Sequence, residues 1–101
     1  STLVEEDRVI AMYHGTEAGN MVAVSTDPLL LNWEKLTGNA VIPVLEQDGS
    51  PQEYTVFDPC IWSKGGKYYS LSGGTLDTKT GGIRRAVDFL FRSNDLINWE
   101  Y

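Results

Sequence analysis

The chain has 101 residues, 14 of them acidic and 8 basic, which gives a formal net charge of −6. This length suits one small domain with a thin hydrophobic core. The acidic balance argues against a nucleic-acid partner, which requires a basic surface, and against binding to an anionic membrane. No apolar run in the sequence reaches the roughly 20 residues needed to span a bilayer. A neutral substrate such as a sugar is compatible with this charge.

The chain contains a single cysteine, Cys60, and a single histidine, His14. One cysteine cannot form an intrachain disulfide, and cysteines cannot build a metal site here, so we predict no metal and no cofactor. Cys60 lies in an apolar stretch and is expected to be a small buried hydrophobe. No signal peptide is visible, and a chain that begins at Ser1 is expected of a processed protein or a fragment.

The first half of the chain consists of short apolar segments separated by turn residues, which is typical of strands. The strands expected here are residues 8–14, 20–25 and 33–36. Gly15 ends the first of them, and Asp27-Pro28 opens a turn in which the following leucines are compatible with one helical turn. A polar loop that contains Gly and Pro is expected over residues 46–53.

The second half repeats this pattern, and no long amphipathic helix is indicated anywhere in the chain. The strands expected here are residues 55–63, 67–72, 86–93 and one that starts at Trp99. Asp58-Pro59 interrupts the first of these strands. Gly73-Gly74 is expected to close the second, before a polar loop over residues 75–82.

A short motif occurs twice and carries most of the information about the fold. Its two copies are Ser25-Thr26-Asp27 with Asn32-Trp33-Glu34, and Ser93-Asn94-Asp95 with Asn98-Trp99-Glu100. In each copy the Asp is expected to begin a turn by accepting backbone N–H groups, and the Trp to pack the outer strand against its sheet. We therefore interpret these residues as part of the fold rather than as sugar-stacking groups.

Two copies of one strand-rich unit fill most of the chain, and four-stranded units repeated at this spacing are typical of propeller blades. The sequence thus predicts an all-β fold, a partial β-propeller of about two four-stranded antiparallel blades. The first blade, residues 1–45, is expected to lack its innermost strand. The second blade, residues 54–101, has that strand as residues 55–63, and residues 46–53 form the loop between the blades.

These residues resemble glycoside hydrolase family 32, the invertase, levanase and inulinase group, whose catalytic domain is a five-bladed propeller. The resemblance rests on the repeated S-x-D and N-W-E motif, on Tyr13 to Gly15, and on the inner-strand pair Asp58-Pro59. It covers nearly the whole chain. The family normally reads R-D-P at that pair, and this chain has Phe57 in place of the Arg.

The resemblance implies a retaining hydrolase of β-fructosides or related glycosides that uses two catalytic carboxylates. The family's nucleophile lies in an N-D-P-N-G-like context and its general acid in an E-C context, and neither motif occurs in this sequence. The chain is therefore expected to carry only a third, supporting carboxylate and to be inactive alone. Its implied partners are a carbohydrate substrate and either the rest of the propeller or other copies of the chain. A secreted or periplasmic location is compatible with the resemblance.

Two other functions are compatible with the sequence. One is a non-catalytic carbohydrate-binding or assembly module built of propeller blades. The other is a plain structural β domain that shares only its turns with the family. Catalytic motifs on either side of these residues in a longer reading frame would favour the enzyme.

Asp58 is the candidate catalytic residue, as a transition-state stabiliser. Either its carboxylate starts an Asp-Pro turn and binds local N–H groups, or it ends an innermost strand and points into the central funnel. In the second case it hydrogen-bonds sugar hydroxyls and stabilises positive charge in the oxocarbenium-like transition state. His14 and Trp62 are candidate substrate-binding residues. Each is also compatible with a structural role, His14 at the polar end of a core strand and Trp62 in the blade core.

Overall fold

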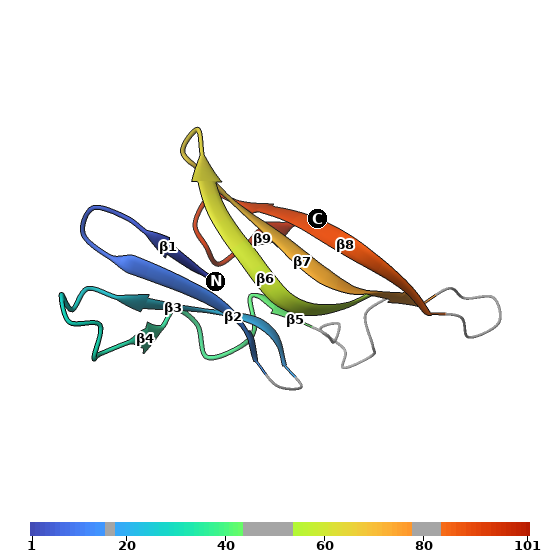
Figure 1. Cartoon of the computed structure of the whole chain (residues 1–101), viewed down its shortest axis with the longest axis horizontal. Coiled ribbons are helices and arrows are strands. Elements are labelled where there is room, and N and C mark those ends of the chain that lie inside the picture. Colours follow the sequence, from blue (N-terminus) through green and yellow to red (C-terminus); the bar gives the residue numbers. More distant parts are fainter. Residues whose placement is uncertain (16–17, 44–53, 78–83) are drawn as a thin grey trace.

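The computed structural model describes residues 1–15, 18–43, 54–77 and 84–101. In this part of the chain nine strands and no helix form two antiparallel sheets, drawn from blue to green and from yellow to red in Figure 1. No helix that is long and apolar enough to cross a membrane therefore occurs in these ranges. The predicted all-β fold is confirmed.

The first sheet has the strand order β1-β2-β3-β4, and β5 pairs with β3. Its strands are β1 (Thr2–Val4), β2 (Val9–Gly15), β3 (Gly19–Ser25), β4 (Glu34–Lys35) and β5 (Ile42–Pro43). Between β3 and β4 the chain makes a tight turn, closed by the bond of 2.9 Å from the N–H of Leu30 to the carbonyl of Asp27. No helix forms there, so the leucines belong to this turn.

The second sheet has the strand order β6-β7-β8-β9, which repeats the order of the first four strands. Its strands are β6 (Tyr54–Lys64), β7 (Lys67–Asp77), β8 (Arg84–Ser93) and β9 (Trp99–Glu100). The predicted loop over residues 46–53 lies outside the described residues. Two sheets with the same four-stranded order are what a pair of propeller blades requires.

The first blade is more complete than the sequence predicted. Its innermost strand was expected to be missing, yet β1 pairs antiparallel with β2 over Thr2–Val4, in the place that β6 takes beside β7. That strand is thus present over three residues. The N–H of Ile61 donates to Ser1 Oγ at 2.8 Å, so the segment that leads into β1 also binds β6.

The hydrophobic core lies where the two sheets meet. The fully or almost fully buried side chains come from both sheets: Ile10, Met12, Val22, Ile42, Val56, Ile61, Phe89, Phe91 and Leu96. In β8 the predicted alternation is confirmed, because Phe89 and Phe91 are buried whereas Asp88 and Arg92 are exposed. One face of each sheet therefore packs against the other sheet.

β6 contains a β-bulge at the interruption that the sequence indicated. Its regular pairing with β7 shifts between Val56 and Pro59, so Phe57 and Asp58 together oppose the single residue Gly73. A bulge of this kind inserts one extra residue into one strand of an antiparallel pair. β6 can accommodate Pro59 next to the bulge because β6 lies at the edge of its sheet.

The extra residue reverses the alternation of side chains along β6. Val56 is buried before the bulge, and Pro59 and Ile61 are buried after it, whereas unbroken alternation from Val56 would bury Cys60 instead. The prediction that Cys60 is a buried hydrophobe is therefore wrong, because Cys60 is exposed. Trp62 follows Cys60 onto the exposed face, so it does not fill the core between the sheets.

β7 does not stop at Gly73-Gly74, as the sequence predicted, but continues to Asp77. A Cβ on Gly74 would lie 2.1 Å from the carbonyl oxygen of Thr55 on β6. The glycine therefore allows two strands to approach closely beside the bulge rather than ending its own strand. The remainder of the predicted loop, residues 78–82, lies outside the described residues.

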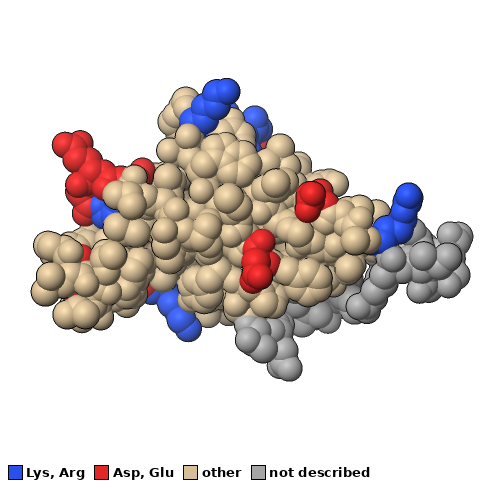
Figure 2. Space-filling view, viewed as in Figure 1, with Lys and Arg blue, Asp and Glu red and all other residues tan. Residues whose placement is uncertain are grey.

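A polar cluster joins the outer ends of the two sheets. Arg8 Nε donates to Glu5 Oε1 at 2.6 Å, and Tyr68 Oη on β7 donates to Glu5 Oε2 at 2.8 Å. These hydrogen bonds hold the pKa of Glu5 below its ordinary value, and the hydrogen bond from Arg8 is the largest cause. In Figure 2 acidic atoms gather at the left, over the end of the β1–β2 hairpin, whereas the middle of the visible face is mostly uncharged.

Candidate functional site

The bulge places Asp58 on the exposed face of the second sheet, on the innermost strand β6. Among the described residues the carboxylate of Asp58 has neither a hydrogen-bond partner nor an ion pair. The local turn that the sequence left open, in which Asp58 binds neighbouring N–H groups, is thus not formed by these residues. The side chain of Asp58 is exposed.

Asp88 lies in the same cross-strand row as Asp58, and the sequence analysis did not connect the two residues. Gly73 of β7 pairs with Asp88 of β8 on one side and faces the bulge on the other. Asp88 Oδ1 lies 3.8 Å from the place where a Cβ on Gly73 would stand. Two carboxylates therefore share this face across a residue without a side chain. The described residues hold no group of three or more potential metal ligands.

His14 lies against the bulge from the other sheet. It is at the end of β2, and its ring meets the ring of Phe57 edge-on with centroids 5.9 Å apart. Nδ1 of His14 is buried and has no hydrogen-bond partner among the described residues. Because Phe57 precedes Asp58 in the bulge, the structure brings two of the three predicted site residues to the same place.

Trp62 lies elsewhere on β6. It stacks on Tyr69 of β7, with ring centroids 5.7 Å apart and planes 15° apart, and is 36% exposed. Four residues of a strand span about 13 Å, so Trp62 shares a face with Asp58 but not a site. Its cross-strand partner is Tyr69, which pairs in turn with Arg92 of β8. The structure therefore does not join Trp62 to Asp58 and His14.

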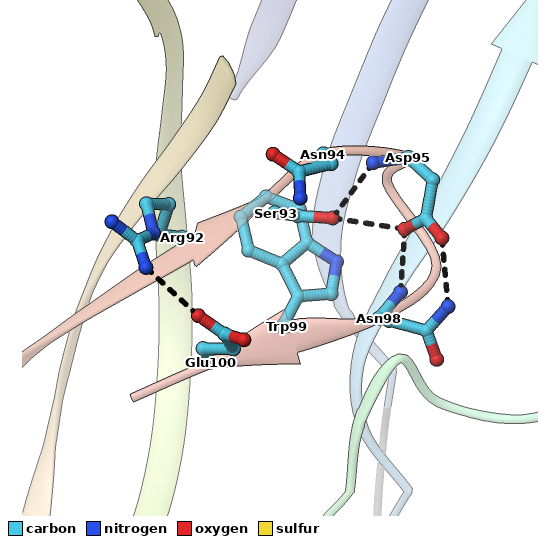
Figure 3. Close-up of a pocket in the computed structure, with 7 residues that line it drawn as sticks. All are labelled: Arg92, Ser93, Asn94, Asp95, Asn98, Trp99 and Glu100. Atoms are coloured by element: carbon cyan, nitrogen blue, oxygen red, sulfur yellow. Dashed lines mark hydrogen bonds and ion pairs between the residues drawn. The ribbon is translucent and has the colours of Figure 1, made fainter.

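The turn between β8 and β9 encloses a shallow hollow of about 110 Å³ (Figure 3). Its lining residues are Arg92, Ser93, Asn94, Asp95, Asn98, Trp99 and Glu100. Asp95 accepts hydrogen bonds from the backbone N–H of Asn98 at 2.8 Å and from Nδ2 of Asn98 at 2.7 Å. Arg92 binds Glu100 at 3.0 Å. These polar groups satisfy one another, which supports the interpretation of the motif as part of the fold.

The first copy of the motif has the same arrangement. Asp27 accepts the backbone N–H groups of Leu29 and Leu31, each at 3.0 Å, and Nδ2 of Asn32 at 3.1 Å. The backbone bond from Leu29 is the largest reason that the pKa of Asp27 lies below its ordinary value. The pKa of Asp95 is lowered further, chiefly by the backbone N–H of Asn98. Neither carboxylate is free to act on a substrate.

Comparison with known proteins connects this geometry to a family. The family model described as "Glycosyl hydrolases family 32 N-terminal domain" matches residues 1–101. No curated protein sequence matches the chain.

One solved structure that matches is a mutant of the Bombyx mori GH32 beta-fructofuranosidase in complex with sucrose. It is 27% identical in sequence to this chain, with a TM-score of 0.68. The match covers 98% of this chain and 21% of that protein. The chain thus spans about a fifth of the length of the structure it resembles.

Proposed function

The chain belongs to glycosyl hydrolase family 32, and from that premise we propose that it is part of a hydrolase of β-fructosides or related glycosides. The likeness to a beta-fructofuranosidase supports this proposal. The observation that links the proposed function to one residue is the position of Asp58 in the inner-strand bulge. Its carboxylate is exposed and has no partner among the described residues. A carboxylate that the fold does not use is available to a ligand.

In the proposed mechanism Asp58 supports catalysis and does not itself break the glycosidic bond. Retaining hydrolysis needs a nucleophile and a general acid whose carboxyl groups lie about 5–5.5 Å apart. We assign both to parts of the polypeptide other than this chain. Asp58 accepts hydrogen bonds from sugar hydroxyls and stabilises the positive charge that develops on the ring. The 101-residue chain alone is therefore inactive.

Phe57 and His14 give the site an aromatic border in this proposal. Phe57 stands where the family normally has an arginine, and its ring packs on the ring of His14. An aromatic pair offers a sugar an apolar surface, but no fixed positive charge. Recognition of the substrate beside Asp58 thus depends on shape and hydroxyl contacts rather than on a guanidinium fork.

The proposed partner of the second sheet is the rest of the propeller. We define the open face as the side of that sheet formed by Trp62, Leu71 and Leu90. These three side chains are 36%, 41% and 51% exposed. Contiguous apolar surface of this kind marks an interaction site. A neighbouring blade covers it in the enzyme, and other copies of the chain cover it in the alternative function, a non-catalytic assembly module.

The test is the substitution Asp58→Asn in the complete polypeptide that contains these residues. We expect turnover of sucrose or inulin to fall about a hundredfold, because one group that stabilises transition-state charge is removed. KM and the melting temperature should change little. Asp88→Asn is the matched control, since it removes a carboxylate from the same row but from β8 rather than from the innermost strand. Near-normal turnover in Asp58→Asn would reject the role.

A further inference from the structure

Two side chains of the first blade contact the second blade at and beside its bulge. His14 of β2 and Asn20 of β3 are direct cross-strand partners. His14 packs its ring against Phe57, which is one of the two bulge residues. Asn20 donates from Nδ2 to the hydroxyl of Ser72 at 2.9 Å, on the strand that faces the bulge.

The contact of Asn20 is made to the side chain of a residue next to the bulge. Ser72 pairs with Pro59, the first residue of β6 after the register shift. The residue of β7 next to Ser72 is Gly73, which faces Phe57 and Asp58. The hydrogen bond from Asn20 therefore fixes β7 directly beside the bulge, and the bulge determines where the Asp58 carboxylate lies.

The burial of Asn20 is costly for stability. Both Asn20 and Ser72 are fully buried, and Oδ1 of Asn20 has no partner within the described residues. A buried amide oxygen without a hydrogen bond destabilises the folded state. The next position on the same face of β3 is Val22, which is an apolar residue in the core. An apolar residue at position 20 would pack equally well, so packing alone does not explain the hydrogen bond from Asn20 to Ser72.

We propose that Asn20, acting through Ser72 and together with His14, is a positioning residue that sets the geometry of Asp58. This inference rests on the proposed role of Asp58 in the hydrolase. Asn20 and Ser72 touch no substrate. They hold the bulge in the one arrangement in which the carboxylate meets the developing charge. A displacement of about 1 Å at a reacting centre is enough to reduce turnover by up to a hundredfold.

The chain offers a matched pair of serines for the test. Ser70 and Ser72 lie on the same face of β7, and both are fully buried. Only Ser72 receives the hydrogen bond of Asn20, whereas the hydroxyl of Ser70 has no partner in the described residues. We expect Ser72→Ala in the complete polypeptide to lower kcat about tenfold with little change in KM. Ser70→Ala should leave both constants unchanged.

A double-mutant cycle separates positioning from general stability. If Ser72 acts through Asp58, adding Ser72→Ala to Asp58→Asn should cause no further loss of kcat, because the group that it positions is already disabled. Asn20→Ala should behave in the same way, and Ser72→Ala serves as the milder variant if Asn20→Ala does not fold.

Two outcomes would overturn the inference and leave the function of Asp58 intact. One is a large loss of kcat in Asp58→Asn with normal kcat in Ser72→Ala and in folded Asn20→Ala. The other is an equal loss of kcat in Ser70→Ala and Ser72→Ala, which would indicate a packing effect on β7. Normal turnover in Asp58→Asn would instead reject the proposed function itself.

Discussion

Leu30 and Leu96 share one unusual backbone conformation, with φ of 55° and 69°, in the two copies of the turn motif. The carbonyl of each accepts a hydrogen bond of 2.9 Å from the indole of the tryptophan three residues later, Trp33 or Trp99. The two turns thus close in the same way, although their Asp residues lie at different distances in sequence from the tryptophan.

This equivalence predicts opposite effects for one substitution. Glycine adopts a positive φ without the strain of a side chain, which costs roughly 1 kcal/mol for leucine. Leu30 is 44% exposed, so Leu30→Gly should be neutral or slightly stabilising. Leu96 is buried in the core, so Leu96→Gly should destabilise by about 3 kcal/mol through the lost packing. Thermal unfolding of the two variants checks this, and equal destabilisation would contradict it.

The pKa of Asp95 predicts sensitivity to acid. Its folded pKa lies below the value of about 3.9 for an unfolded aspartate. The contribution of the ionised Asp95 carboxylate to the stability of the fold is therefore complete above about pH 4, and it is lost as the pH falls toward the folded pKa. Asp95→Asn should be less stable than the original chain at pH 7, and the difference should shrink in acid. Melting temperatures between pH 7 and pH 2 measure the effect.

The control for that series is Asp88→Asn. The carboxylate of Asp88 makes no hydrogen bond or ion pair with the described residues, so its removal should not reproduce the effect of Asp95→Asn at pH 7. A difference between Asp95→Asn and the original chain that stays constant with pH would show that the backbone bonds to Asp95 do not cause the stabilisation.

Gly74 should not tolerate a side chain. A Cβ there would lie 2.1 Å from the carbonyl oxygen of Thr55, so Gly74→Ala must push β6 and β7 apart beside the bulge. We expect a loss of more than about 3 kcal/mol, at the upper end of overpacking effects. Gly38→Ala is the control, because apart from its chain neighbours no atom of the described residues lies within 4 Å of its Cβ position. Similar melting temperatures for the two variants would contradict the close approach.

The isolated chain should associate through the open face. Its three apolar side chains are exposed to solvent in the single chain, and their burial in a contact is favourable. Leu90 is the most exposed of them, so Leu90→Lys should weaken association most. Analytical ultracentrifugation over a range of concentrations measures this. A compact monomer at high concentration would show that the open face does not drive assembly.

The sequence predicted what depends on neighbours along the chain. Asp27 and Asp95 find their partners within five residues, so the composition of each turn was sufficient to assign them to the fold. The two-blade architecture followed from the repetition of those turns. The exposure of Cys60 was not predictable in this way, because it depends on an extra residue that only the pairing of β6 with β7 reveals.

The surroundings of Asp58 were predictable only in part. The Asp58-Pro59 pair indicated an interruption, and a bulge is present there. The contact of His14 with Phe57 joins positions 43 residues apart, and that of Asn20 with Ser72 joins positions 52 residues apart, each between the two sheets. No local pattern marks such contacts. Asn20 stood inside a valine-rich strand, and a single polar residue in such a strand was the one available signal.

The bulge makes the number of residues between Val56 and Pro59 as important as their identity. Replacing Phe57 leaves that number unchanged, so both halves of β6 keep their faces. Deleting one residue would leave a single residue opposite Gly73 and restore regular alternation, so Pro59 and Ile61 would stay buried and Cys60 and Trp62 exposed. The bulge would be lost, however, so a deletion is expected to leave the strand in place while removing the paired arrangement of Phe57 and Asp58.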